Sequence, residues 1–170
     1  MTHQRDRIRA HIDAHAGLHF NELTRQLDLA PGQVQYHTRK LEHQEKIVAE
    51  PLFGQTHYFT TGYDPWERKI LALFRRETAR DVLVYLLEHG PSRPNAVAES
   101  LGIARSTLEW HLDNLVESAI VEKRRGAQNR VTLALCQPEA TARLLGEITP
   151  SLPDRLVDRF VRLVDSLLTE

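Results

Sequence analysis

The chain has 170 residues, which fits one domain or two small ones, and its 41% hydrophobic content is ordinary for a globular protein. The 22 Lys and Arg nearly balance the 23 Asp and Glu, so any surface that attracts nucleic acid must be local. The single cysteine, Cys136, excludes an internal disulfide and a cysteine-based metal cluster. The polar N-terminus and the lack of a long apolar run predict a cytoplasmic protein with no secretory signal and no membrane span.

A pattern of apolar residues recurs along the sequence at an offset of 74 positions. In each copy an apolar residue and a turn precede an aromatic-His pair, and a Leu follows the His. The first copy lies in residues 29–48 and the second in residues 103–122. Self-similarity at a fixed offset indicates duplicated structural units. We therefore expect two tandem units.

Residues 1–62 have the pattern of the first unit. Ile8 and Ile12 are spaced for an amphipathic first helix, and Asn21 is the expected N-cap of a second. Ala30-Pro31-Gly32 cannot continue the second helix, because proline lacks an amide hydrogen and restricts the residue before it. A third helix is expected to begin there, which makes a helix-turn-helix.

A hairpin is expected after the third helix. Two β-rich runs, IVAEPLF and THYFTT, flank Gly54-Gln55, where glycine would supply the turn. Helices followed by a hairpin are the winged-helix plan. The only basic residue expected near this first wing is His57.

The third helix of the first unit, at about residues 31–45, is expected to bury Val34, Thr38 and Leu41 on one face. Its other positions carry residue types that bind adenine or guanine edges and phosphate. The sequence has no acid between Asp28 and Glu42. We predict that this face contacts a DNA major groove through Gln33, Gln35, Tyr36, Arg39 and Lys40.

An alternative interpretation is open for this helix. Polar exposed faces are common, so it is also consistent with a solvated amphipathic helix in a protein-interaction module. His37 and His43 lie beside the core seam, where a histidine is more often packed and hydrogen-bonded than a base contact or a ligand.

Residues 63–77 are expected to form a linking helix, since Trp66, Ile70 and Phe74 recur at helical spacing. The segment is rich in Lys and Arg. These side chains would either contact phosphate or form a solvated face.

Residues 78–136 repeat the plan as a second unit, with a buried stripe of Leu108, Leu112, Leu115 and Val116 expected in its third helix. The outward face of this helix begins with three polar residues, Arg105, Ser106 and Thr107, and then turns acidic at Glu109, Asp113 and Glu117.

The hairpin of the second unit is basic around its Gly126–Asn129 turn. We predict that the first unit contacts bases and the second wing contacts the DNA backbone. The predicted backbone contacts are Lys123, Arg124, Arg125 and Arg130, assisted by Arg105, Ser106 and Thr107.

Residues 137–170 are expected to form C-terminal helices. The last segment has apolar residues in steps of four, three and four, a wider stripe than one small domain needs. It would either pair with a second copy in a homodimer or fold back over its own units. The predicted dimer contacts are Leu156, Phe160, Leu163, Val164 and Leu167.

The string from Gly17 to Val48 resembles the helix-turn-helix of archaeal winged-helix transcriptional regulators of the ArsR and MarR type. In that family the third helix habitually contains YHLRKLE, and residues 36–42 here are YHTRKLE. Thr38 replaces the usual Leu, whereas WHLDNLV of the second copy retains it as Leu112. The resemblance covers both units and implies DNA-binding roles for Gln33, Gln35, Tyr36 and Arg39. The acidic residues on the third helix of the second unit depart from the family's pattern.

The predicted fold class is therefore mainly α with small β-hairpins, as two tandem winged helix-turn-helix domains plus a C-terminal helix. The predicted function is a sequence-specific double-stranded DNA-binding transcriptional regulator. The alternative is a tandem winged-helix protein-interaction subunit of a chromosome-maintenance or transcription complex.

No enzyme motif, cofactor or metal site is predicted, since the chain shows no phosphate-cradling glycine loop, paired-carboxylate pocket or nucleophile motif. The one candidate for zinc is His11 with His15, one turn apart on the first helix. The expected alternative is that both are ordinary polar residues beside the apolar stripe.

Overall fold

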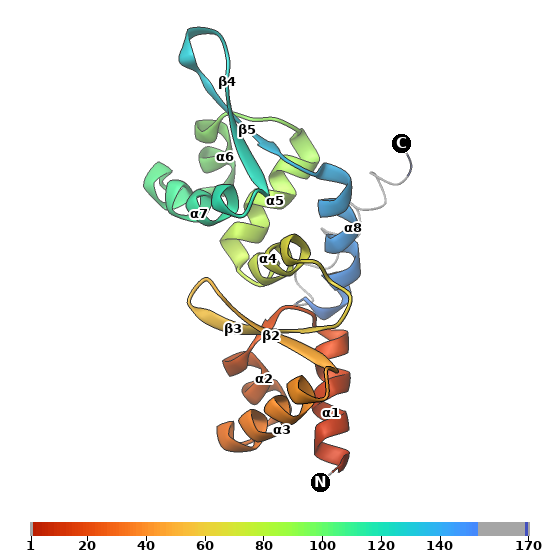
Figure 1. The fold of residues 1–170 in the computed structure, drawn as a ribbon. Helices are drawn as coiled ribbons and strands as arrows, with labels where there is room; N and C mark the ends of the chain where they lie inside the picture. Colours follow the sequence, from red (N-terminus) through yellow and green to blue (C-terminus); the bar gives the residue numbers. More distant parts are fainter. Residues whose placement is uncertain (1, 153–168, 170) are drawn as a thin grey trace. The chain divides into compact units, whose positions relative to one another are not determined.

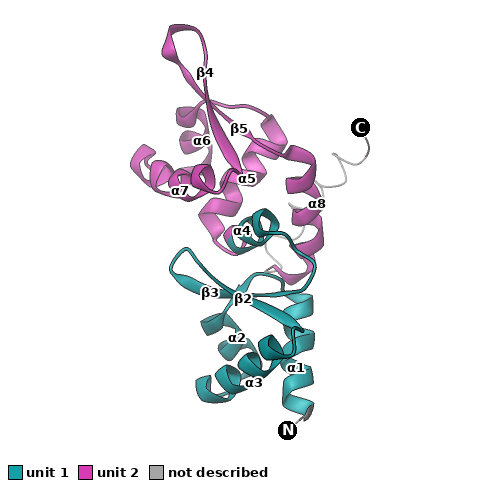
Figure 2. Ribbon diagram, viewed as in Figure 1, with its two compact units in different colours: residues 1–72 teal, residues 73–170 magenta. Residues whose placement is uncertain are grey.

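The structure, a computed structural model, describes residues 2–152 and residue 169. The chain divides into two compact units, residues 1–72 and residues 73–170 (Figure 2). The boundary falls inside the helix α4, Pro65–Phe74. The finer division predicted above, with a separate linking helix and C-terminal region, stays a prediction.

Unit 1 contains three helices and a small sheet before α4 (Figure 1). The sheet has the strand order β1-β3-β2 and is antiparallel throughout. The elements are α1 (Thr2–Ala14), β1 (Leu18–His19), α2 (Phe20–Leu27), α3 (Pro31–His43), β2 (Ile47–Leu52) and β3 (Gln55–Thr60).

The core of unit 1 is built by the apolar positions that repeat at helical spacing. Ile8 and Ile12 of α1 are fully buried, as are Leu23 of α2 and Val34 of α3. Helix α1 packs against both α3 and β3. The amphipathic stripe of each helix therefore faces one shared interior.

Gly17, at the end of α1, is required by a close backbone approach. Its φ is +87°, and a Cβ there would lie 2.9 Å from the carbonyl carbon of Leu71. Glycine is the residue that tolerates both conditions. It lets the chain turn from α1 into β1 directly against α4.

The hairpin turn of unit 1 lies one residue earlier than predicted. Leu52 pairs with Gln55, so the loop is Phe53-Gly54 rather than Gly54-Gln55. Both loop residues have positive φ, 52° and 83°. A two-residue turn of this kind matches the twist of antiparallel strands and here places glycine second.

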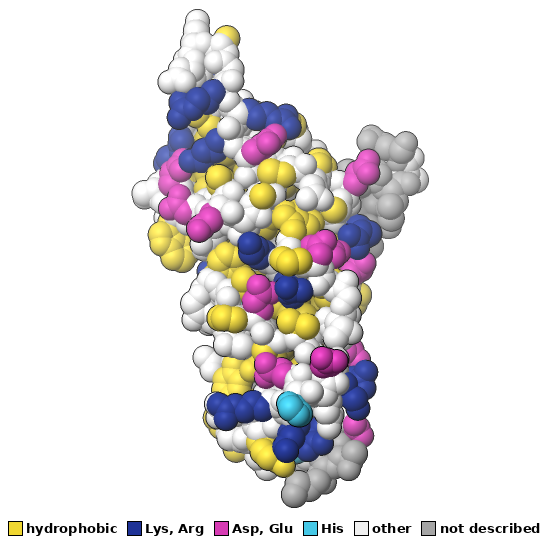
Figure 3. All heavy atoms as spheres, in the orientation of Figure 1, with side chains coloured by type: hydrophobic (Ala, Val, Ile, Leu, Met, Phe, Trp, Pro, Cys, Tyr) yellow, Lys and Arg dark blue, Asp and Glu magenta, His cyan; other side chains and the backbone are white. Residues whose placement is uncertain are grey.

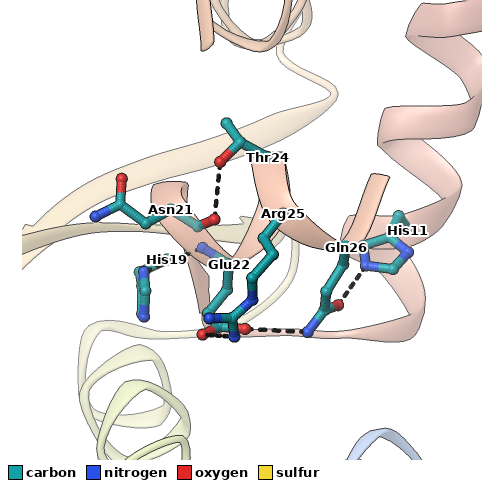
Figure 4. Close-up of polar contacts among 7 residues, drawn as sticks. All are labelled: His11, His19, Asn21, Glu22, Thr24, Arg25 and Gln26. Carbon is teal, nitrogen blue, oxygen red and sulfur yellow. Dashed lines mark hydrogen bonds and ion pairs between the residues drawn. The ribbon is translucent and has the colours of Figure 1, made fainter. Parts of the chain in front are cut away.

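The start of α2 also differs from the prediction. The N-cap is His19, whose Nδ1 accepts a hydrogen bond from the Glu22 N–H at 3.4 Å, and the helix begins at Phe20. Asn21 lies inside the first turn and is exposed, and its backbone carbonyl accepts the Thr24 hydroxyl (Figure 4). The imidazole of His19 therefore caps α2, which is the role that was predicted for the side chain of Asn21.

Unit 2 repeats the plan. Its elements are α5 (Glu77–His89), α6 (Pro94–Leu101), α7 (Arg105–Glu117), β4 (Val121–Arg125), the short 3-10 helix Ala127–Asn129, β5 (Val131–Leu135), α8 (Pro138–Ile148) and a second 3-10 turn (Thr149–Ser151). The predicted fold class is thus confirmed for the part of the chain that the structure describes.

Strand β1 of unit 1 has only a short counterpart in unit 2. Where unit 1 has β1, unit 2 has a single bridge between Ser92 and Leu133, with backbone hydrogen bonds of 2.9 and 2.7 Å. Ser92 lies 74 positions after Leu18, so the bridge preserves the position of β1. Leu108, Leu112 and Leu115 are fully buried as predicted, but Val116 is 37% exposed. Val116 lies one position past the stripe and points outward.

Within residues 2–152 and 169, no helix has the length and apolarity needed to cross a bilayer.

Candidate nucleic-acid interface

Helix α3 begins at a turn that fixes its first residues. The preceding helix ends at Asp28 in the left-handed conformation, with φ 52°, and Pro31 opens α3. The Ala30 carbonyl accepts the N–H groups of Gln33 and Val34 at 3.0 and 3.1 Å. The Gln33 side chain returns the contact, since its Oε1 accepts the Ala30 N–H at 3.3 Å.

The inner side of α3 is anchored by Val34, Thr38 and Leu41, each no more than 1% exposed. His37 is also buried, at 7% exposure. Burial, with the nearby charge of Arg5, lowers the pKa of His37 from its ordinary value of 6.5. The imidazole is therefore a packed, neutral group near pH 7, as expected. The expected hydrogen bond is not seen at its buried Nδ1, which has no partner among the residues that the structure describes.

The outer side of α3 carries the five residues predicted to contact DNA. All five are exposed, and Tyr36 is 49% exposed with the Lys40 ammonium 5.7 Å from its ring centroid. Part of the Gln33 amide is engaged in the cap described above. The structure brings together on one helix face Gln33, Gln35, Tyr36, Arg39 and Lys40.

A cleft of about 540 Å³ lies beside this face, between α3, the start of α2 and the β2–β3 hairpin. Gln35 and Arg39 line one wall. The other walls hold polar residues that the sequence did not predict as contacts, because only the tertiary fold brings them next to α3: His19, Asn21, Gln55 and Thr56.

His57 is not part of this exposed surface. The sequence placed it near the first wing as a basic residue, but it is 1% exposed. Its Nδ1 lies 2.6 Å from the Gly17 carbonyl oxygen, so this nitrogen donates. The side chain ties β3 to the segment after α1, so His57 lies in this wing as expected but presents no exposed basic group there.

In unit 2, the first residues of α7 are exposed, but Arg105 is held by neighbours. Its guanidinium donates to Glu109 at 3.0 Å and to the Asn95 side-chain oxygen at 2.6 Å. Ser106 and Thr107 are exposed beside it. Asn95 lies on α6, so Arg105 joins the two helices of the helix-turn-helix.

Glu109 also receives a cation from the wing. The Lys123 ammonium lies 2.8 Å from its other carboxylate oxygen. The hydrogen bond from Lys123, with that from Arg105, holds the pKa of Glu109 below its usual range, although burial opposes the shift. A single carboxylate thus joins α7 to β4.

The remaining cations lie on the β4–β5 hairpin, and Figure 3 shows Lys and Arg side chains below its tip. Arg124 pairs with Glu122 at 2.6 Å, and Arg125 donates to the Asn129 side chain at 2.9 Å. All of these groups are exposed, as is Arg130. Exposed pairs of this kind are weak, so the arginines can exchange these partners for phosphate.

The outer face of α7 differs from that of α3. Trp110 is 61% exposed and Val116 37% exposed, with the exposed carboxylates of Asp113 and Glu117 on the same side. Carboxylates on this face repel phosphate.

His11 and His15 stack at 3.9 Å between ring centroids, and one ring nitrogen of each has a hydrogen-bond partner in the protein. The His11 Nε2 lies 2.7 Å from the Gln26 side-chain oxygen, and the His15 Nδ1 lies 2.9 Å from the His11 carbonyl (Figure 4 shows the first contact). Among the residues that the structure covers, no three His, Cys, Asp or Glu side chains converge to hold a metal. The predicted dimer contacts, Leu156, Phe160, Leu163, Val164 and Leu167, lie outside the described residues.

Solved structures show only distant likenesses. The structure of RV1404 from Mycobacterium tuberculosis is 17% identical with a TM-score of 0.39, covering 61% of this chain and 80% of that one. The structure of overoxidized AbfR bound to DNA is 18% identical with a TM-score of 0.41, covering 81% and 92%. Disulfide-formed AbfR is 19% identical with a TM-score of 0.39, covering 88% and 93%. At these values the likenesses carry no argument about function. No curated protein matches the chain.

Two protein-family models match separate parts of the chain. Residues 2–71 match a family described as an N-terminal HTH domain, and residues 75–122 match one described as winged helix-turn-helix DNA-binding. The two matches fall on the two units of the structure. They support a DNA-binding protein, and they match both units to helix-turn-helix domains, the second of them of the DNA-binding winged type.

Proposed function

We propose that the chain is a sequence-specific double-stranded DNA-binding transcriptional regulator in which α3 enters the major groove. Gln35 and Arg39 would bond base edges, while Tyr36 and Lys40 would contact phosphate. Gln33, whose amide is partly engaged at the helix start, would contribute its free donors.

The observation that carries this proposal is the outer face of α3. Five residues suited to DNA are exposed together, and their helix is held by a fully buried inner side. From Gln33 to Lys40 this helix carries no acid, which suits a groove lined by phosphates. The first acid is Glu42, which is exposed and lines the same cleft as Gln35 and Arg39. The match of residues 2–71 to an HTH family supports the same role.

For unit 2 we propose contact with the DNA backbone by the wing. Lys123, Arg124, Arg125 and Arg130 are exposed around one hairpin, with Arg105, Ser106 and Thr107 at the start of α7. Cations on a wing fit phosphates flanking a groove. The acids further along α7 argue against deep entry of that helix.

The proposal keeps three predictions from the sequence. They are a homodimer formed through the C-terminal residues, membership of the ArsR or MarR type with an archaeal source, and a location in the cytoplasm, where an archaeal chromosome lies. A dimer would bind two half-sites related by its symmetry.

The test is selection of bound duplexes from a random-sequence pool, followed by fluorescence anisotropy on the selected duplex across a salt series. We expect one enriched motif and a steep loss of affinity with rising salt, because each neutralised phosphate releases counterions. Footprinting upstream of the chain's own gene would then locate a natural site.

Two variants test whether α3 contacts the DNA bases through Arg39. Arg39→Ala should weaken binding by about 1 to 3 kcal/mol, or roughly fivefold to 150-fold. Arg9→Ala removes an exposed arginine from α1 and should leave affinity unchanged. No enrichment, or equal effects of the two variants, would exclude base contact by α3.

A second function is favoured by one observation, the outer face of α7. An exposed tryptophan beside Val116, Asp113 and Glu117 is typical of a surface that binds protein, since Trp is enriched at the centres of interfaces. This supports the alternative of a tandem winged-helix interaction subunit. Absence of duplex binding even at low salt would favour it over a regulator.

A further inference from the structure

Unit 2 contains a groove of about 920 Å³ between the end of α5, strand β5 and helix α8. Its walls are mainly apolar and include Leu87, Pro91, Ala134, Leu135, Pro138 and Ala142. No residue of α7 lines the groove, and Arg124 is the one lining residue that is also proposed to contact DNA.

The groove exists because small residues stand where larger side chains would fill the space. Gly90 ends α5, and its positive φ of 70° favours glycine. Ala142 and Gly146 are four residues apart and so share one face of α8, and both line the groove. On the inner side of α8, Leu144 and Leu145 are fully buried, so this wall is rigidly placed.

The charged residues that line the groove balance in number, with Arg124 and Arg143 against Glu139 and Glu147. Arg143 pairs with Glu147 at 3.3 Å, and Arg124 pairs with Glu122 at 2.6 Å. Balanced charges give an ionic ligand little net attraction. The Arg124 guanidinium has five N–H donors, more than one carboxylate uses, so it can still donate to an uncharged oxygen.

We propose that this groove is a binding site for an uncharged, largely apolar small molecule that carries an acceptor oxygen, such as a carbonyl or hydroxyl group. The volume falls in the range of about 300 to 1,000 Å³ that holds small ligands, and apolar walls with a few polar groups are their usual setting. The apolar body lies between α5 and α8, and the oxygen accepts from Arg124.

Arg124 links the groove to the wing. It lines the groove and also belongs to the cations proposed to contact phosphate. A ligand that holds Arg124 toward the groove removes it from DNA, which couples the two sites through one side chain. This coupling rests on the proposed function, whereas the binding site itself does not.

The binding test uses Nile red, an uncharged apolar dye with a carbonyl oxygen whose fluorescence rises in apolar surroundings, titrated into the full chain. We expect saturable one-to-one binding at least tenfold tighter than that of the anionic dye 8-anilinonaphthalene-1-sulfonate. Ala142→Phe should fill the groove and weaken Nile red at least tenfold. Ala96→Phe, a matched change at an exposed position of α6, should leave it unchanged.

Leu87→Gln keeps the side-chain size but makes the wall of the groove polar. It tests the same site if circular dichroism shows that Ala142→Phe does not fold. The proposal is overturned by absence of saturable binding, by equal affinity in both Phe variants, or by tighter binding of the anionic dye. It is also overturned if Nile red binds only after residues 153–170 are deleted, because the full chain would then cover the groove itself.

The coupling is tested by measuring duplex affinity with and without saturating Nile red. We expect at least a threefold loss of affinity in the native chain and none in Arg124→Gln. Unchanged duplex affinity with bound dye would overturn the coupling while the site stands. A chain that binds no duplex would overturn the proposed function. The Nile red titration would still show whether the groove binds an uncharged apolar molecule.

Discussion

Helices α3 and α7 occupy equivalent places in the two units yet present opposite chemistry. At the positions 74 apart, Tyr36 corresponds to Trp110, Arg39 to Asp113 and Lys40 to Asn114. The aromatic residue is exposed in both, but the cations around it in α3 are replaced by an acid and an amide in α7.

The inner sides of the same helices stay alike. Val34 corresponds to Leu108 and Leu41 to Leu115, and all four are buried. Buried positions decide whether the unit folds, since they lose contact with water and pack together. Exposed positions are free to change with the partner. The comparison therefore separates the residues that specify the fold from those that specify function.

The largest expected effect comes from the shared core. Leu41→Ala and Leu115→Ala each remove a side chain no more than 1% exposed, so each should lower the free energy of unfolding by about 2 to 5 kcal/mol. Urea unfolding measures both. Val116→Ala, at an exposed position, should cost within about 0.5 kcal/mol. If Leu115→Ala cost no more than Val116→Ala, the equivalence of the two cores would fail.

A charge exchange sharpens the contrast between the outer faces. Arg39→Asp puts into α3 the residue that α7 has, and should weaken duplex binding by at least about 1 to 3 kcal/mol because it replaces attraction by repulsion. Asp113→Arg makes the reverse change and should raise affinity at low salt. Anisotropy at two salt concentrations measures both. An equal loss from the two variants would show that both helices depend on their native faces.

His37 and His111 are equivalent residues that predict the same pH dependence in both units. Burial is the main cause that lowers the pKa of each from 6.5, assisted by Arg5 for His37 and by Arg76 for His111. With the folded pKa lower than the unfolded one, the unfolded chain binds more protons between the two values. The stability that comes from keeping these two imidazoles neutral is therefore fully present above about pH 7.5. It falls as the pH drops through 6.5 toward the pKa of the folded state.

Chemical unfolding at pH 7.5 and at pH 5.5 measures this fall. His37→Gln and His111→Gln should each make the stability less dependent on pH. His43→Gln, at an exposed position near the end of α3, is the matched control and should keep the native dependence. A native dependence in all three variants would assign the pH effect to other groups.

The sequence predicted what depends on local spacing. Ile8 and Ile12, the Pro31 start of α3 and the exposed set from Gln33 to Lys40 follow from helical periodicity and from the turn chemistry of proline and glycine. The fold class followed from the repeat of that pattern. The assignment of DNA contacts to these residues stays a prediction.

What the sequence missed depends on contacts between distant residues. His57 is buried because the Gly17 carbonyl, 40 positions earlier, lies against it. The cleft beside α3 takes one wall from the start of α2 and another from the hairpin. The basic wing of unit 2 looked free in the sequence, yet Lys123 meets Glu109 of α7. Charge counts along the chain cannot show which charges meet.

The contact of Lys123 with Glu109 yields the smallest expected effect. Glu109 occupies the position that corresponds to Gln35 and holds both Lys123 and Arg105. Glu109→Gln should cost less than about 1 kcal/mol of stability, because pairs this exposed are weak.

Duplex binding responds in the opposite direction to stability. Removing the carboxylate leaves two cations for phosphate, so affinity should rise by a few fold and the salt dependence should steepen by up to about 0.9 for each added phosphate contact. Gln35→Glu, the reverse change in unit 1, should weaken binding. Anisotropy across a salt series measures both. If Glu109→Gln left affinity and slope unchanged, these two cations would not contact DNA, and the backbone role of unit 2 would rest on Arg124, Arg125 and Arg130.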